Sequence, residues 1–325
     1  SWEHALGAKR GLRFSASRTR DFDVPRTDRM NAGFGQTNPS DDEHFFTLQD
    51  RERYQLTYTD TEAGFTDGMQ VRASLRRYDE KRRIRARNST TRRLEQDVTD
   101  TLGLGADWTK ALGDTHLLTW GFDADYDEVD STRDNVNINT GVVTAAGGTF
   151  QPDSKYLSSG LFVRDEISAF EAFDLTAGLR YAFVDYSFKD FTTGVKDEGD
   201  ASALTGSLQV ARNVAEGARV TGTIAQAFRA PNLAELAKSG TFAGGTELAN
   251  PDLDPETALY EEIALDLVRP TWNAAFGVYH NAIDNAAARR LISDPTPGVP
   301  GDEVYQRANG GELEYYGIEA SCKRK

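Results

Sequence analysis

Cysteine, histidine and long apolar runs are nearly absent from this chain. Its 325 residues include one Cys and four His, which excludes a disulfide framework and a zinc–thiolate site. No stretch reaches the roughly 18 apolar residues of a transmembrane helix. The 37 Lys and Arg stand against 51 Asp and Glu, and the resulting net charge of −14 argues against a nucleic-acid partner.

Catalytic motifs are also missing. The chain contains no G-x-S-x-G, no Walker loop and no H-E-x-x-H, so an enzyme is the least supported class, and we expect no resident cofactor or metal. Residues 1–4 lack the basic start and apolar core of a signal peptide. We expect either that such a peptide has been removed or that the chain begins inside a larger protein.

Alternation of apolar and polar residues is the dominant pattern. From Leu118 to Tyr126 every second residue is apolar, and the same period of two runs from Leu175 to Phe183. Such alternation indicates strands with one apolar and one polar face. Helical periodicity is weak, and its best candidate is the short segment 232–237.

About twelve segments qualify as strands. Many run to about 10–14 residues, which exceeds the five or six usual in globular sheets and suits the about 9–11 of a tilted membrane strand. The predicted strands are 3–17, 45–58, 69–80, 98–109, 117–130, 155–168, 175–188, 203–211, 219–228, 259–267, 273–288 and 304–320.

The connections between these segments alternate in length without exception. Long connections such as 131–154 and 229–258 alternate with short ones such as 110–116 and 268–272. Outer-membrane barrels have short periplasmic turns and long extracellular loops, whereas a soluble sandwich has no reason to sort its loops by length. The pattern therefore predicts an all-β fold, an antiparallel up-and-down transmembrane β-barrel. A soluble sandwich or propeller is the alternative that alternation alone would allow.

A barrel predicts where individual side chains point, because its lumen is polar and its outer belt is apolar with interfacial aromatic residues. A mean hydropathy of −0.56 is compatible with this fold, since lumen and loops outweigh the belt. We expect the following to face the lumen: Asp123, Asp125, Asp127, Arg72, Arg76 and Arg180. We expect the following to face lipid or its interface: Trp120, Phe122, Tyr126, Tyr181 and Phe183.

Four short boxes carry a family resemblance. Residues 228–236 read FRAPNLAEL and residues 250–256 read NPDLDPE, and they resemble the FRAPNLxEL and NPDLKPE boxes of TonB-dependent outer-membrane receptors. Residues 279–284, and Asn309 with the later Gly317–Glu319, are similar to two further boxes in the same order. Each box alone is weak, and the four together are specific.

This resemblance implies a 22-stranded barrel, plugged by an N-terminal domain, that imports iron–siderophore, haem or cobalamin through contact with the TonB complex. About twelve of those strands are present, and the plug and the TonB-contacting box are absent. We therefore expect an internal barrel fragment, with residues 1–320 as the partial barrel and 321–325 as a tail outside the family. The implied location is the outer membrane of a Gram-negative bacterium, with its lipid as a partner, and we expect a monomer.

The first two boxes supply the candidate ligand-binding residues. Phe228 ends a predicted strand and Pro231 cannot continue a ladder, so a long loop must leave the barrel there. A rigid strand–loop corner without ligand contact is the alternative; we favour it for Pro251, and both readings stay open for Arg229. The candidates are Phe228, Arg229, Pro231, Asn250, Pro251, Asp252 and Leu253.

The ligand itself stays open between haem and a ferric siderophore. Residues 24–28 and 49–58 look most like haem and haemoglobin receptors, in which a histidine between the first two boxes often ligates the iron. Residues 229–249 contain no His, which removes that axial candidate. His44 and His280 lie elsewhere, and ligation through Tyr or contact through loops remains possible for haem.

Two charged runs have alternative interpretations. The Arg-rich run 81–93 falls in the predicted long connection 81–97, where it would attract anionic siderophores or lipopolysaccharide phosphates or would simply be a solvated loop. The acidic run 123–130 would bind Ca²⁺ or line the lumen. The period of two separates its carboxylates by about 6.5–7 Å, which is long for one ion and favours the lumen wall.

Three functions remain at this point. The first is a TonB-dependent transporter barrel for an iron complex. The second is a passive porin-like or adhesin barrel without a plug, and the third is a soluble all-β binding module. A plug of about 150 residues upstream of Ser1 would separate the first from the second, and dependence on detergent would separate both from the third.

Overall fold

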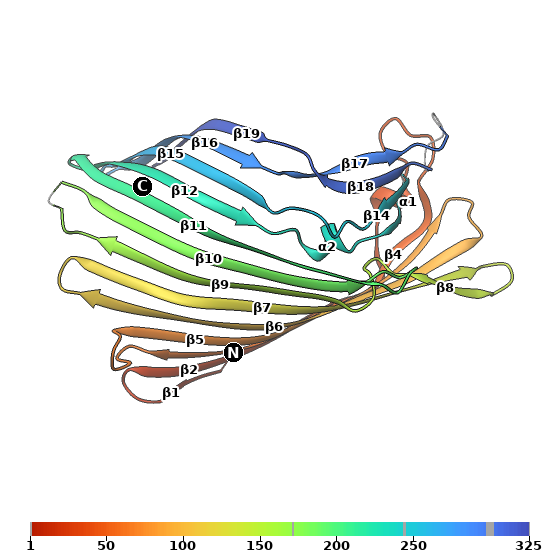
Figure 1. Cartoon of the computed structure of the whole chain (residues 1–325), viewed down its shortest axis with the longest axis horizontal. Coiled ribbons are helices and arrows are strands. Elements are labelled where there is room, and N and C mark those ends of the chain that lie inside the picture. The colour runs from red at the N-terminus through yellow and green to blue at the C-terminus, as the bar shows by residue number, and fades with distance from the viewer. Residues whose placement is uncertain (1, 171, 243–244, 297–301, 325) are drawn as a thin grey trace.

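One large antiparallel sheet dominates the computed structural model, which describes residues 2–170, 172–242, 245–296 and 302–324 (Figure 1). Its strands follow the order β1-β2-β4-β5-β6-β7-β9-β10-β11-β12-β15-β16-β19. The sheet curves like the wall of a barrel, with β1 and β19 at its two edges. This architecture confirms the predicted all-β, antiparallel, up-and-down wall.

The strands of the wall are long and arranged as successive hairpins. Their bounds are β1 (Trp2–Ala5), β2 (Arg10–Asp21), β4 (Asp41–Asp60), β5 (Gly68–Ala86), β6 (Thr91–Leu112), β7 (His116–Asn137), β9 (Ser154–Ile167), β10 (Asp174–Lys189), β11 (Lys196–Ala215), β12 (Ala218–Arg229), β15 (Glu256–Val268), β16 (Trp272–Asp284) and β19 (Leu313–Arg324). Residues 321–324, which we set apart as a tail, are the end of β19, and the division at residue 320 stays a prediction.

Shorter elements gather at one end of the wall, the end of the long connections (Figure 1). A second sheet has the order β13-β14-β18-β17, in which β14 and β18 are parallel. Among the described residues no helix is long and apolar enough to cross a membrane. The bounds are β3 (Val24–Pro25), α1 (Thr27–Met30), β8 (Val143–Gly147), α2 (Leu233–Leu236), β13 (Gly240–Phe242), β14 (Gly245–Leu248), β17 (Ala287–Ser293) and β18 (Val304–Asn309).

Three predicted strands were wrong because each contains a turn. The segment 3–17 is the β1–β2 hairpin, 273–288 runs from β16 into β17, and 304–320 is β18 followed by β19. The breaks contain residues in left-handed or related backbone conformations, such as Asn285 with φ of 58° and Gly311 with φ of 113°. Hydropathic alternation carries no information on backbone dihedrals, so it runs through these turns unnoticed.

The Arg-rich run was wrongly placed in a long loop. Residues 81–86 belong to β5 and 91–93 to β6, which leaves only 87–90 as the connection. The alternation of loop lengths therefore fails here, since the connection 61–67 at the opposite end is longer. Ion pairs between neighbouring strands, such as Arg82 with Asp97, let charged residues extend the sheet beyond its apolar belt.

The two faces of the wall follow the prediction. Arg180 donates to both carboxylate oxygens of Asp123 at 2.8 Å, and Arg76 donates to Asp125 at 2.6 Å. Thr101 donates to Asp127, the third carboxylate of the run. The acidic run therefore lines the inner face with partners from β5, β6 and β10, and the described residues contain no cluster of His, Cys, Asp and Glu suited to a metal ion.

Glycine permits one of these inner-face pairs. A Cβ at residue 160 of β9 would lie 2.2 Å from the Arg180 guanidinium, which crosses this strand to reach Asp123 on β7. On the opposite face Trp108 and Trp120 stack at a centroid distance of 6.4 Å, and Phe122 lies beside them. Polar and aromatic residues are thus sorted between lumen and belt.

Candidate functional site

The first two boxes meet in one corner at the extracellular end of the wall, which we name the box corner (residues 228–237 and 250–256). β12 ends at Arg229, the chain turns through α2, and it returns to β15 at Glu256. Asn232 caps α2 by accepting from the backbone N–H of Glu235, whose side chain accepts from the Asn232 backbone N–H. This reciprocal capping box explains why one short helical turn forms at the predicted position.

Apolar side chains fix α2 against the inner face of the wall. Leu236 and Ala237 are fully buried, and Leu233 and Leu253 are nearly so. They pack with a group of residues from β7 and β10 that consists of Val129, Val184, Tyr186 and Phe188. The box corner is therefore a small hydrophobic core inside an otherwise polar lumen.

Arg229 joins the two ends of the box corner. Its guanidinium donates to Glu235 at 2.7 Å and to Glu256 at 2.5 and 2.7 Å. Glu256 also accepts from the backbone N–H of Ala287 at 2.7 Å. Both carboxylates are largely buried, whereas the Arg229 side chain is 44% exposed. The hydrogen bonds are charge-assisted because both partners are ionised. The structure thus gives Arg229 an intramolecular partner on each side.

Polar contacts to the prolines and to Asn250 complete the box corner. The Tyr156 hydroxyl donates to the Pro231 carbonyl at 3.0 Å, and the Tyr186 hydroxyl donates to the Pro251 carbonyl at 2.6 Å. Asn250 donates to the Arg307 carbonyl at 2.7 Å and accepts from the backbone N–H of Asp252 at 3.0 Å. These bonds pair carbonyl groups that Pro-containing turns leave without ladder partners.

The structure therefore brings Phe228, Arg229, Pro231, Asn250, Pro251, Asp252 and Leu253 to one place, as the boxes suggested. Their contacts within the chain match the rigid corner that we held as the alternative. Ligand contact by these residues stays a prediction.

The box corner holds the short strap that follows it, residues 237–240. Lys238 forms a β-bridge with Phe150, and the Ser239 backbone N–H donates to the Thr149 carbonyl at 3.2 Å. Gln151 donates from its side chain to the Ser239 hydroxyl at 3.0 Å. These bonds fix Lys238 and Gly240 at the rim of a neighbouring pocket.

This basic pocket, as we call it, encloses about 360 Å³ at the extracellular end of the inner face. Seven cationic side chains line it against three carboxylates, an excess of four positive charges in a chain that is otherwise strongly acidic. Its charged residues are Arg26, Arg29, Arg82, Arg93, Arg133, Lys238 and Arg289, with Asp41, Glu95 and Glu247; His44, Ile84, Thr149, Ser239 and Gly240 complete the lining.

Two of the three carboxylates of the basic pocket are each shared among several cations. Glu95 lies 2.9 Å from Arg133, 3.4 Å from Arg82 and 4.0 Å from Arg93. Glu247 pairs with Arg289 at 2.7 Å and with Arg307 at 3.2 Å. Asp28 outside the lining also pairs with Arg26, and Glu80 and Asp97 pair with Arg82, so these acids offset part of the surplus. The charges of the lining itself still favour an anionic ligand.

Titration of Glu247 reflects this surplus of cations. Burial raises the pKa of the Glu247 carboxyl, but hydrogen bonds and attraction from Arg289 and Arg307 outweigh burial and hold its pKa below the ordinary value. Burial also raises the pKa of Asp97, which lies beside Arg82 near the pocket. Glu247 therefore remains ionised at neutral pH and continues to anchor both arginines.

Sequence reasoning identified the Arg-rich run but not the pocket. The run alternates across β5 and β6, so Arg82 and Arg93 point inward to the pocket while Arg83, Arg85 and Arg92 gather around Glu43 outside it. Arg92 and Arg85 in turn lower the pKa of Glu43, mainly through hydrogen bonds. The period of two within the run is the signal that would have separated its inward-pointing arginines from its outward-pointing ones.

His44 is the histidine nearest to a ligand role. It lines the basic pocket, its side chain is 13% exposed, and its Nδ1 lies 2.7 Å from an Asp41 oxygen. Such a contact orients an imidazole and leaves Nε2 for another partner. His280 and His116 instead lie near Glu261 and Asp165, respectively, on other strands.

Comparison with known proteins places this geometry in a family. The sequence profile described as "TonB dependent receptor-like, beta-barrel" matches residues 2–323. The chain is 28% identical over 235 residues to the ferric enterobactin receptor PirA of Pseudomonas aeruginosa, an alignment that covers 68% of this chain and 28% of that protein. It is 26% identical over 214 residues to the iron-regulated outer membrane virulence protein of Vibrio cholerae, covering 63% and 29%.

Solved structures resemble the whole wall. The copper transporter OprC superimposes with a TM-score of 0.75 at 14% identity, covering 98% of this chain and 56% of that one. The siderophore receptor PirA from Pseudomonas aeruginosa gives 0.65 at 17% identity, covering 98% and 51%. A HasR hemophore receptor from Serratia marcescens, in complex with HasA and heme, gives 0.62 at 15% identity, covering 98% and 57%.

At these identities the structural matches establish the fold alone, and the sequence alignments span less than a third of the length of the two curated relatives. The family profile, by contrast, covers nearly the whole chain, in agreement with the boxes and the curved antiparallel wall. This membership excludes the soluble module and the enzyme class. The chain belongs to the TonB-dependent receptor-like β-barrel family and forms part of the wall of an outer-membrane barrel.

Proposed function

We propose that this chain is the ligand-capturing part of a TonB-dependent receptor that imports an anionic iron complex, a ferric siderophore, across the outer membrane. The observation that carries the proposal is the basic pocket, with its excess of four positive charges on the lumen side. The name of the relative from Pseudomonas aeruginosa, a ferric enterobactin receptor, supports the same ligand class. In this proposal the TonB complex supplies the energy for import.

Capture in the basic pocket follows from its charge distribution. A ferric complex with acidic chelating groups carries negative charge, and guanidinium groups already held by Glu95 and Glu247 can pair with it without reorganising. Lys238 adds a charge from the strap, and the described residues include no ion-pair partner for it. Attraction of this kind also speeds the encounter with the ligand.

Haem is a second candidate, which His44 supports. Its imidazole lines the basic pocket, where arginines suited to haem propionates also lie. Haem binding through His44 predicts a shift of the Soret band that disappears in H44A. A ferric siderophore as the ligand predicts no dependence on His44 at all.

The test uses the full-length receptor and measures binding of ferric enterobactin and of haemin. The double variant K238Q/R289Q removes two charges from the pocket, and we expect it to weaken ferric enterobactin binding by about tenfold to a hundredfold. R77Q/K81Q is the matched control, because it removes two charges from β5 outside the pocket. Equal affinities in both variants would show that the pocket is not the capture site.

Import, as distinct from capture, needs its own measurement. Uptake of labelled ferric enterobactin by cells should stop when TonB is deleted, while binding to the cell surface persists. Uptake that continues without TonB would instead support the passive porin-like or adhesin alternative. A full-length gene without a plug region upstream of this wall would also support the passive porin-like or adhesin alternative.

A further inference from the structure

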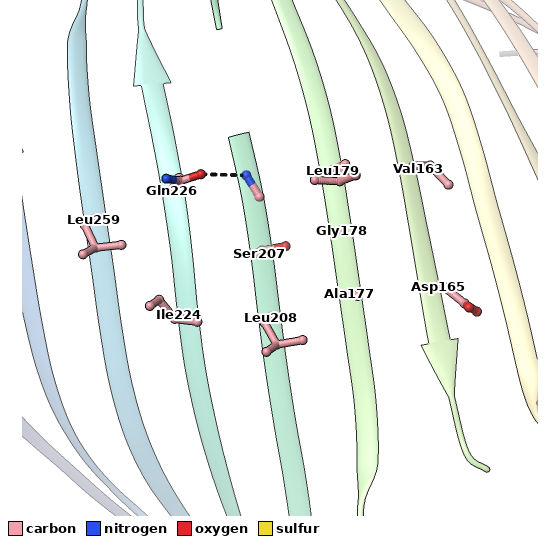
Figure 2. Close-up of a pocket in the computed structure, with 11 residues that line it drawn as sticks. Val163, Asp165, Ala177, Gly178, Leu179, Ser207, Leu208, Ile224, Gln226 and Leu259 are labelled. Carbon is pink, nitrogen blue, oxygen red and sulfur yellow. Dashed lines mark hydrogen bonds between the residues drawn. The ribbon is translucent and has the colours of Figure 1, made fainter. Parts of the chain in front are cut away.

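A groove on the outer face of the wall is not used by the proposed function. It encloses about 490 Å³ and crosses the wall from β9 to β15 (Figure 2). Leu179 lines the groove. Successive side chains of a strand point to opposite faces, and the neighbouring Arg180 points to the lumen, so Leu179 and the groove face the membrane. Its volume falls within the about 300–1,000 Å³ of ligand pockets.

The floor of the groove exists because Gly206 has no side chain between tall aliphatic neighbours. Leu179 pairs with Gly206 across β10 and β11, and Leu208 pairs with Ile224 across β11 and β12. Leu179, Leu208 and Ile224 are 54%, 41% and 44% exposed, respectively. The groove is therefore continuous with the apolar belt that faces lipid, but it is deeper than the belt around it.

The sheet ladder also opens at this point. Within the described parts of both strands, the paired register of β11 and β12 ends at Ser207 and Ala225, although each strand continues. The Gly206 backbone N–H instead donates to Oε1 of Gln226 at 3.2 Å (Figure 2). Gln226 Nε2 has no hydrogen-bond partner among the described residues, which leaves a donor at the rim of an apolar groove.

Gln226 lies toward the extracellular end, three residues before β12 ends at Arg229. A ligand that fits must then carry a hydrogen-bond acceptor at its extracellular end and an aliphatic chain below it. An acyl chain of lipid A has this form, because an amide or ester carbonyl joins the chain to the headgroup. Lipid A also forms the outer leaflet of a Gram-negative outer membrane, and a donor without a partner is costly in lipid.

We propose that this groove holds one acyl chain of lipid A, with its carbonyl accepting from Gln226 and its methylene groups lying against Leu179, Leu208 and Ile224. The site depends on the outer-membrane location of the family and not on which ligand the receptor imports. It fixes one outer-leaflet lipid at the point where the paired register of β11 and β12 ends.

The substitution G206L tests the groove by filling it. A Cβ at residue 206 meets Leu179 at 3.6 Å and Gln226 at 3.8 Å, which are ordinary contacts, so the strand tolerates a side chain there. G222L is the matched control, because Gly222 lies on the same face two residues from Ile224, outside the groove, with nothing within 4 Å of its Cβ. Gel migration before and after heating verifies that both variants fold.

Native mass spectrometry of the full-length receptor, stripped of lipid in detergent and mixed with hexa-acylated lipid A, gives the readout. We expect one tightly held lipid A on the wild type and on G222L, and at least a tenfold loss of occupancy on G206L. Equal occupancy in G206L and G222L would overturn the proposal, as would equal binding of phosphatidylethanolamine.

The variant Q226E tests the donor without filling the groove and serves also where G206L does not fold. It keeps an acceptor for the Gly206 N–H and removes the Nε2 donor. We expect a several-fold loss of lipid A occupancy. Unchanged occupancy in Q226E would show that the Gln226 donor does not hold the lipid.

Discussion

The box corner and the basic pocket lie side by side at the extracellular end of the lumen, and they differ in almost every property. The box corner is apolar inside, capped and internally bonded, with Leu236 fully buried and Arg229 held by two carboxylates. The basic pocket is open, charged and only partly neutralised. Family boxes mark the first region, while no motif marks the second.

We interpret this difference as a division of roles, in which the box corner is a scaffold and the basic pocket is the proposed ligand site. The boxes specify a rigid turn that holds the strap 237–240, and the strap then presents Lys238 to the basic pocket. In the proposed function the residues of the recognised motif act through position, whereas the cationic groups of the basic pocket are spread over the chain from Arg26 to Arg289. The predictions below test this division, beginning with the largest expected effect.

The box corner should lose most stability through L236A. Leu236 is fully buried, and such truncations cost about 2–5 kcal/mol of unfolding free energy. Denaturant unfolding of the full-length receptor, followed by protection of the residue 228–237 amides, measures the loss. L248A is the control, since Leu248 is 40% exposed, and a loss of the same size there would contradict a core at α2.

Removal of the Arg229 guanidinium should weaken the box corner but leave the basic pocket intact. R229A leaves Glu235 and Glu256 without their shared cationic partner. Hydrogen bonds to charged groups contribute about 1.5–3 kcal/mol to the free energy of unfolding. R164A, which breaks the exposed pair with Glu166, should cost under about 1 kcal/mol. Ligand affinity measured on folded R229A should stay within about threefold of the wild type; a larger drop would favour direct ligand contact by Arg229.

Salt should affect the two regions differently. Ferric enterobactin binding at the basic pocket should weaken several-fold between about 0.05 and 0.5 M NaCl, because exposed charges are screened over about 10 Å at 0.1 M. Unfolding of the box corner should change little over the same range, since its core is apolar. Titration calorimetry at both salt concentrations measures the first effect, and salt-independent affinity would contradict electrostatic capture.

Acid should loosen the second sheet, with the smallest effect of the four. The folded-state pKa of Glu247 is lowered, so its contribution to stability is present above the ordinary carboxyl value of about 4.3 and is lost as pH falls through the lowered pKa. Hydrogen exchange of β14 and β18 at pH 6 and pH 3 measures this change. In E247Q the change in hydrogen exchange between pH 6 and pH 3 should be smaller than in the wild type. A change of the same size in E247Q would show that Glu247 is not its cause.

Alternation and the boxes predicted much of the wall. The strands around Trp120 and Tyr181 and the inner position of Asp123, Asp125 and Arg180 were correct, because period two follows directly from the pleat of a strand. The short helix at 232–237 was also correct, since its capping residues are local in sequence.

The strand ends and the basic pocket were not predictable in the same way. The segment 81–93 looked like a loop because its charges hid the strand pattern, and only the pairs across β5 and β6 show why it is extended. The pocket joins Arg29, Arg133 and Arg289, which come together through sheet register and curvature rather than sequence spacing.

The sequence alone determined the class, the faces and the family of this protein, because hydropathic period, loop composition and the four boxes are local properties of the chain. Only the tertiary structure decided that the boxes form a bonded corner, that Arg82 and Arg93 of the Arg-rich run point into the lumen, and that Gly206 opens a groove to the membrane. Each of those outcomes depends on which strands become neighbours and in what register, and pairings between distant segments are fixed by the folded sheet as a whole.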